Sequence, residues 1–99
     1  MIEIFEEWVK SHSTYWNEMG ITIDDIGSHP KHYFSPSTWV KLSTKTAFGQ
    51  IQIWEGENLY LMDFMAVNDE KDFYRHYEFT DVHNFDDWQK EFLSFMCGV

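Results

Sequence analysis

Hydrophobic and polar residues alternate over much of the chain, which predicts a series of β-strands. The alternation covers residues 21–27, 37–43, 47–55, 59–67 and 73–80. The last four of these strands are separated by the short segments 44–46, 56–58 and 68–72. Such short connections favour hairpins, so we expect an antiparallel meander of about five strands. The segment 28–36, which contains two prolines, is expected to form a loop.

Apolar residues at helical spacing predict one helix at each end of the chain. The first covers residues 2–19, and its apolar stripe consists of Phe5, Trp8, Val9, His12, Trp16 and Met19. The second begins after Asn84, a suitable N-cap, and its stripe consists of Phe85, Trp88, Phe92, Phe95 and Met96. A helix with a single stripe can cover a sheet but cannot be enclosed by protein. We therefore expect one α+β domain over residues 1–99, a two-layer sandwich with both helices on one face of the sheet.

The segment GQIQIWEGENLYLMDF, residues 49–64, indicates which strand residues face away from the helices. Ile51 and Ile53 lie on one face of the predicted strand, so the glutamines and the tryptophan between them lie on the other. We expect the uncovered face of the sheet to carry Trp39, Phe48, Gln50, Gln52 and Trp54. An error of one residue in the assignment would instead place both tryptophans in the core.

The strand over residues 59–67 is apolar on both sides, so its alternation does not decide which side faces the helices. Asp63 shares the uncovered face only if the apolar residues of the same parity, Leu59, Leu61 and Met65, do so too. The alternative is that one helix crosses the other side of the sheet.

The chain is strongly acidic, and its acidic residues are unevenly placed. Seventeen aspartates and glutamates against seven lysines and arginines give a net charge of −10. Residues 26–54 contain no acid, whereas acids dominate residues 55–72 and 78–91. Such a field repels nucleic acids and anionic membranes and attracts basic proteins. Solubility alone explains most acidic proteins, but the clustering of the acids also favours a protein partner.

Neither a metal site nor a cofactor is expected. His29 and His32 lie three residues apart, but no third ligand follows at a recognisable spacing. The single cysteine, Cys97, excludes an internal disulfide and fits a reducing compartment. The acidic N-terminus does not resemble a signal peptide, and no segment is apolar enough to span a membrane, so we expect a cytoplasmic protein.

The catalytic alternatives are also weak. His12 lies on the apolar stripe of the first predicted helix, where we expect a histidine at the margin of the core. His76 and Glu78 share one face of a predicted strand and form a candidate acid–base pair, although a structural surface pair is the commoner arrangement. The sequence contains no Gly-x-Ser-x-Gly motif and no phosphate-binding glycine-rich loop. We therefore expect no catalytic residues.

Two short motifs resemble those of a known family. GQIQIWE at residues 49–55 has the form G-x-I-x-I-W-E, and HYEF occupies residues 76–79. With these motifs and the order of its predicted elements, the chain from FEEWV to FLSFM resembles the TriTu family of bacterial immunity proteins. Only the segment GSHPKHYFSPSTWV does not align. The resemblance implies a small cytoplasmic protein of a polymorphic toxin system that neutralises a cognate toxin by non-catalytic binding.

We therefore interpret the chain as a binding protein and not as an enzyme. Many toxins of such systems act on anionic substrates and have basic active sites, which an acidic protein approaches rapidly. The residues expected to bind the toxin combine the aromatic face with nearby acids: Trp39, Gln50, Gln52, Trp54, Glu55, Glu57, Asp63, Asp69 and Glu70. The alternative is an acidic homodimerising or adaptor domain, in which the same tryptophans pack against a second copy.

Overall fold

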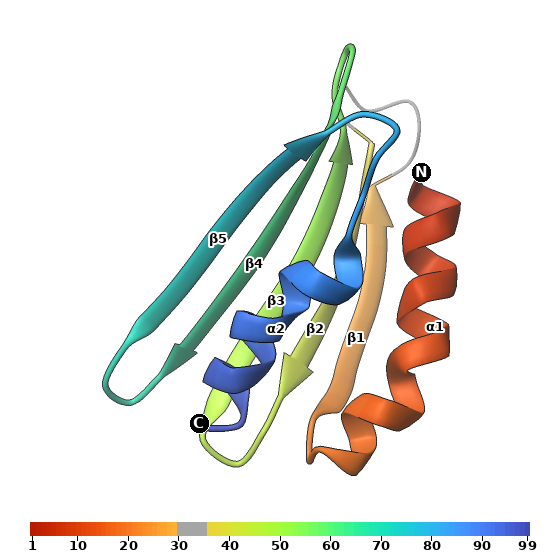
Figure 1. Cartoon of the computed structure of the whole chain (residues 1–99). Helices are drawn as coiled ribbons and strands as arrows, with labels where there is room; N and C mark the ends of the chain where they lie inside the picture. The colour runs from red at the N-terminus through yellow and green to blue at the C-terminus, as the bar shows by residue number, and fades with distance from the viewer. Residues whose placement is uncertain (30–35) are drawn as a thin grey trace.

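The described residues form one antiparallel sheet and two helices, as a computed structural model shows (Figure 1). The structure describes residues 1–29 and 36–99, so the predicted loop residues that include His32 lie outside the described part. In chain order the elements are α1 (Ile2–Glu18), β1 (Thr22–His29), β2 (Ser37–Ser43), β3 (Ala47–Glu55), β4 (Tyr60–Asn68), β5 (Asp72–Phe79) and α2 (Phe85–Met96). The five strands follow one another in the sheet in the order β1-β2-β3-β4-β5, and every neighbouring pair is antiparallel. The predicted α+β meander is therefore confirmed.

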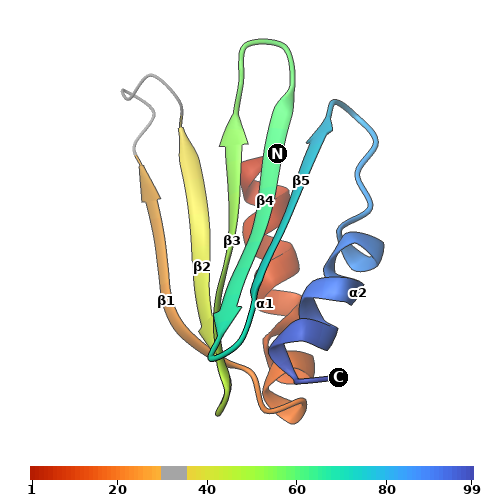
Figure 2. The ribbon, with the colours of Figure 1, turned by 90° about the vertical axis from the view of Figure 1, so that its left-hand side faces the viewer.

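Both helices pack on the same face of the sheet (Figures 1 and 2). Helix α1 contacts β1, β2 and β3, while α2 contacts β3 and β4. The core lies between the two layers, where Phe5 and Trp16 of α1 and Phe92 of α2 are almost fully buried. These side chains meet alternate residues of the central strands, which include Val40, Leu42, Ile51, Ile53, Met62 and Phe64. The alternative with a helix on each side of the sheet is thus excluded.

Polar contacts join the two helices at the margin of the core. The indole Nε1 of Trp16 donates a buried hydrogen bond to Gln89 Oε1 at 3.0 Å. Nearer the surface, Trp8 Nε1 donates to Asp86 Oδ1 at 2.8 Å, and His12 Nε2 lies 3.0 Å from the same oxygen. The half-buried His12 is therefore a structural residue at the core margin, as its position on the apolar stripe predicts.

Strand β1 differs from its prediction in length and regularity. It continues to His29, so the first two residues of the expected loop belong to the strand. Its pairing with β2 shifts between Ile23 and Asp25, which is a β-bulge. Because of the extra residue, Ile26 pairs with Val40 on the helix side and Gly27 pairs with Trp39 on the opposite side. A regular strand would have placed Gly27 and Ile23 on the same face.

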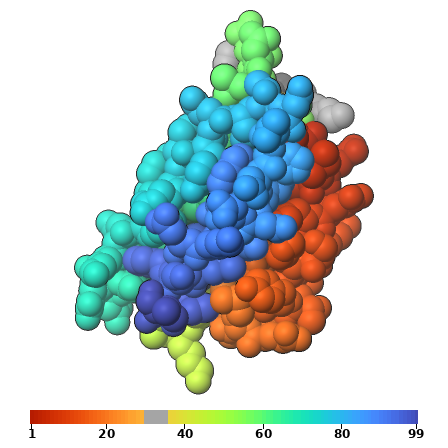
Figure 3. All heavy atoms as spheres, viewed as in Figure 1, coloured from red at the N-terminus to blue at the C-terminus, as the bar shows by residue number. Residues whose placement is uncertain are grey.

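The side chains of the two helices cover one broad side of the molecule (Figure 3). Beside α2, the edge strand β5 and its hairpin remain visible on this side. None of the helices in the described ranges, 1–29 and 36–99, is long and apolar enough to cross a membrane.

Gly49 lets α2 approach β3 closely. It pairs with Ala66 of β4 on the helix side of the sheet. A Cβ atom at this position would lie 2.7 Å from Met96 Sδ and 2.8 Å from Phe92 Cζ. Because both of those side chains are fully buried, neither has free space into which to move.

We therefore expect Gly49→Ala to lower the free energy of unfolding by about 1–2 kcal/mol, since the overpacking outweighs the smaller conformational entropy of the unfolded alanine chain. Denaturant titration followed by circular dichroism measures this loss. The control is Phe48→Thr at the neighbouring exposed position, which should change stability by less than about 0.5 kcal/mol. Equal stability of Gly49→Ala and the wild type would show that α2 does not pack this closely against β3.

Candidate protein-binding face

No element of the described residues covers the sheet face opposite the helices, and we call this face the open face. The strand register places its residues in four rows that run across the sheet. From β2 to β5 these rows are Ser37–Trp54–Leu61–Glu78, Trp39–Gln52–Asp63–His76, Lys41–Gln50–Met65–Tyr74 and Ser43–Phe48–Val67–Asp72. The predicted facing of both tryptophans, both glutamines and Phe48 is therefore confirmed. Asp63 shares this face with Leu61 and Met65, as the alternation required.

Large apolar and aromatic side chains are exposed on the open face. Phe48 is 70% exposed, Tyr74 54% and Val67 45%, whereas Ile51, Ile53, Met62 and Phe64 on the helix side of β3 and β4 are fully buried. Trp39 and Trp54 are half-buried. A contiguous group of exposed apolar side chains on a small protein is typical of an interaction surface.

Trp39 is partly used within the fold. Its indole lies over the backbone of Gly27 on the edge strand, so closely that a Cβ there would be 2.3 Å from Trp39 Cζ2. The ring of His29 lies beside it, with the two ring centroids 5.0 Å apart. Trp39 therefore covers part of β1 with its indole ring.

The two glutamines of β3 form a hydrogen-bonded line along the middle of the open face. Gln50 Nε2 donates to Gln52 Oε1 at 2.8 Å, and Gln52 Nε2 donates to Ser37 Oγ at 3.2 Å. These bonds hold the amide groups in place before any partner arrives. Along β3 the glutamines lie between Trp54 and Phe48, so they separate two aromatic ends of the face.

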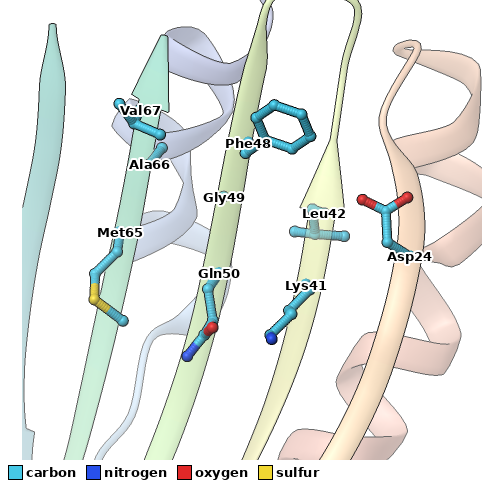
Figure 4. Close-up of a pocket in the computed structure, with 9 residues that line it drawn as sticks. All are labelled: Asp24, Lys41, Leu42, Phe48, Gly49, Gln50, Met65, Ala66 and Val67. Carbon is cyan, nitrogen blue, oxygen red and sulfur yellow. The ribbon is translucent and has the colours of Figure 1, made fainter.

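The end that carries Phe48 contains a hollow of about 410 Å³ (Figure 4). We call it the Phe48 hollow; it is lined by Asp24, Lys41, Leu42, Phe48, Gly49, Gln50, Met65, Ala66 and Val67. Most of these residues are apolar, and the two charged ones, Asp24 and Lys41, have opposite signs. This hollow has the character of a site for an apolar side chain.

The other end contains a smaller hollow of about 230 Å³, which we call the Trp54 hollow. Its lining consists of Trp54, Glu55, Gly56, Leu61, Asp63, Tyr74 and His76. Asp63 Oδ1 accepts a hydrogen bond from the Tyr74 hydroxyl at 3.2 Å and lies 2.5 Å from His76 Nδ1. The other ring nitrogen, His76 Nε2, lies 3.6 Å from Glu78 Oε1. One histidine thus bridges two carboxylates.

These contacts change the titration of two groups in the Trp54 hollow. The hydrogen bond with Asp63 raises the pKa of His76 above its ordinary value of 6.5, and Glu78 adds to the effect. Loss of water around the Tyr74 hydroxyl, followed by the charge of Asp63, raises the pKa of Tyr74. The carboxylates therefore favour the protonated form of both neighbours.

The structure brings only part of the predicted binding set together. Trp39, Gln50, Gln52, Trp54 and Asp63 lie on the open face, and Glu55 lines the Trp54 hollow at the end of β3. Glu57 lies exposed in the turn after β3, whereas Asp69 and Glu70 lie in the turn after β4, at the opposite end of the sheet (Figure 1).

Sequence reasoning left the facing of β4 undecided and did not assign β5 to the face. Leu61, Met65 and Val67 belong to the open face, but their strand is apolar on both sides. Tyr74 and the contact of His76 with Asp63 were also missed, because that contact depends on the register between two strands. The sequence did contain one signal: Tyr74, His76 and Glu78 alternate along one strand and therefore share one of its faces.

The described histidine, cysteine and acidic side chains show little resemblance to a catalytic or metal-binding centre. His76 and Glu78 share a face as predicted, but the closer partner of His76 is Asp63. Cys97 lies at the end of α2, where its thiol is near the carbonyl oxygen of Met19. Burial raises the pKa of this thiol. In the described part of the chain, no group of three histidine, cysteine or acidic side chains is placed to hold a metal ion.

Residues 3–95 match the model of the family described as immunity protein TriTu. The chain belongs to this family. Membership implies neutralisation of a toxin, and immunity proteins of this kind are typically non-catalytic. A cognate toxin is therefore the implied partner of this TriTu protein. No curated protein and no solved structure shows significant similarity to the chain.

The contact of His76 with Asp63 predicts a pH-dependent contribution to the stability of this TriTu protein. Since the pKa of folded His76 is raised, the pairing stabilises the fold below the unfolded pKa of 6.5 and is lost as pH rises through the folded pKa. His76→Gln should therefore be less stable than the wild type at about pH 5.5 and equally stable at about pH 8.5. Solvent screening of the half-exposed histidine keeps the difference below about 1 kcal/mol.

Denaturant titrations at the two pH values measure this difference. The matched control is His83→Gln, because His83 is exposed and makes ring contacts but no ion pair within residues 1–29 and 36–99. A loss of stability in His76→Gln that is the same at both pH values would show that the ring contributes by packing and not by charge.

Proposed function

We propose that this chain is a cytoplasmic immunity protein that neutralises its cognate toxin by binding it directly through the open face. The observation that carries the proposal is the uncovered sheet face, on which exposed aromatic side chains lie on both sides of a hydrogen-bonded polar line. Aromatic side chains in shallow hollows are the residues that most often dominate binding energy in protein interfaces. A rigid sheet also presents them with little loss of conformational entropy on binding.

The helical layer is a poorer candidate for the main contact. Its outer surface carries mostly charged and solvated side chains, including Glu3, Glu6, Glu7, Asp87 and Glu91. Charged residues of this kind are depleted from the centres of interfaces, whereas aromatic residues are enriched there. The open face has the composition of an interface centre, and the helices have that of a solvated surface.

The acids at both ends of the sheet suit a role in steering. Glu57 lies in the turn at one end of the open face, while Asp69 and Glu70 lie in the turn at the other. Charges at the rim of an interface mainly accelerate association and add little affinity, because they remain exposed to water. With a net charge of −10, the protein would associate fastest with a basic toxin.

The size of the open face is suitable for a specific complex. Five strands at about 4.8 Å spacing and four rows at about 7 Å spacing give a surface of roughly 20 by 25 Å. With the two hairpin tips, this approaches the area of about 800 Å² that one partner buries in a standard interface. The toxin need not contact the helices to form a stable complex.

The proposal is tested by two tyrosines of similar exposure on opposite layers. Tyr74 on the open face is 54% exposed and Tyr15 on α1 is 50% exposed. We expect Tyr74→Ala to weaken binding of the toxin encoded beside the gene by at least about 30-fold, equivalent to about 2 kcal/mol, because it removes an exposed aromatic contact from the open face. Tyr15→Ala should leave the affinity unchanged. Isothermal titration calorimetry with the purified toxin domain measures both.

A variant at the other end of the open face completes the test. Phe48→Ala should also weaken binding, because Phe48 is the most exposed aromatic side chain on this face. If Tyr15→Ala alone weakened binding, the contact surface would be the helical layer. Sedimentation of the free protein tests the alternative of a homodimer: a stable dimer that Phe48→Ala dissociates, together with no toxin binding, would replace the proposal.

A further inference from the structure

We infer that the Trp54 hollow is the receptor for a single basic side chain, an arginine, of the bound toxin. This inference rests on the proposed function and identifies the chemistry of the partner at one end of the open face. It follows from the size of the hollow, from its aromatic walls and from the half-buried carboxylate of Asp63, which has no lysine or arginine partner among the described residues.

The hollow has the size and the walls of a side-chain receptor. Its volume of about 230 Å³ lies below the roughly 300–1,000 Å³ of most small-molecule sites, so it accommodates one side chain. The lining includes the rings of Trp54 and Tyr74 and the apolar side chain of Leu61. A guanidinium group stacks on aromatic rings, and the arginine stem packs against apolar surface.

Within residues 1–29 and 36–99, no lysine or arginine pairs with Asp63, the open-face carboxylate of the hollow. The side chain of Asp63 is only 13% exposed, so this carboxylate is largely withdrawn from water. Within the described ranges, the ion pairs of basic side chains are elsewhere: Arg75 pairs with Glu91 and Lys90 pairs with Asp87. A half-buried carboxylate is costly without a counter-charge, so a cation from the partner gains more here than at an exposed acid.

His76 is the internal competitor of the incoming cation. The titratable and charged groups that face it are Asp63 on β4 and Tyr74 and Glu78 on its own strand, while the helices lie on the other side of the sheet. Protonated His76 supplies the positive charge that the carboxylates require. Neutral His76 leaves this charge to be supplied by the partner, so arginine binding should strengthen as pH rises.

The direction of this linkage follows from the titration of His76. Its pKa is raised in the free protein, and a bound guanidinium beside Asp63 would lower it again by repulsion. Binding of arginine therefore releases a proton between the two pKa values, and affinity increases with pH over that range. One unit of difference between the two pKa values corresponds to a tenfold change in affinity.

The Phe48 hollow does not share these features. Its charged residues, Asp24 and Lys41, have opposite signs, and Asp24 already accepts a hydrogen bond from Ser43 Oγ at 3.0 Å. The receptor for a basic side chain is therefore assigned to the Trp54 end of the face alone.

The first experiment needs no toxin. The protein labelled with ¹⁵N is titrated with N-acetyl-arginine amide and, as a matched neutral probe, N-acetyl-citrulline amide. We expect the arginine probe alone to shift the Trp54 indole N–H resonance and the backbone resonances of Asp63 and His76. Asp63→Asn should abolish these shifts. Equal shifts with both probes, or none, would overturn the inference.

The second experiment separates this inference from the proposed function. Toxin affinity is measured between about pH 5.5 and about pH 8.5 for the wild type and for His76→Gln. We expect the wild type to bind roughly tenfold more tightly at the higher pH and His76→Gln to lose most of this dependence. If Phe48→Ala weakens toxin binding but Asp63→Asn and pH do not, the arginine receptor is wrong and the open face remains the interface. If no open-face variant changes toxin affinity, the proposed function is wrong as well.

Discussion

The packing of two amphipathic helices on one side of a single sheet is the constraint on which the rest of the molecule depends. Each helix has one apolar stripe, and both stripes are used on the same layer, with Phe5, Trp16 and Phe92 almost fully buried there. Each of these side chains contributes about 1.5–3 kcal/mol of apolar burial, which the helices would lose if they left the sheet. Since residues 1–29 and 36–99 form no third element that could cover the other face, the sheet presents its second set of side chains to solvent. The open face is thus a consequence of how the core is built.

The alternation in β3 predicted the facing of the sheet because its isoleucines and glutamines differ sharply in polarity. Ile51 and Ile53 had to be buried, so Gln50, Gln52 and Trp54 had to face away. The same reasoning could not decide β4, because a strand with apolar residues on both sides buries equal area in either orientation. It also missed the bulge in β1, since an extra residue at Asp24 leaves the composition of the strand unchanged. Only pairing with the regular strand β2 shows that Ile26 and Gly27 have exchanged faces.

The candidate site was less predictable than the fold because it depends on neighbours across strands. The parity of Asp63 and His76 within their own strands was readable, but their contact requires the particular register of β4 against β5. Charge clustering along the chain was a poorer guide. Glu57 and the pair Asp69 and Glu70 are close in sequence, yet successive hairpin turns place them at opposite ends of the sheet. Antiparallel connections separate acids that a sequence window groups together.

That separation suggests a division of roles on the open face. Acids at the hairpin tips remain hydrated, so they act on a partner at long range and lose their influence as salt increases. Asp63 is largely withdrawn from water beside Trp54 and Tyr74, so it acts only on a group that enters the hollow. A partner with basic charge but without a side chain shaped for the hollow would be attracted and then released. At the proposed interface, discrimination between cognate and non-cognate toxins would depend on the half-buried carboxylate, while the net charge would govern how often they meet.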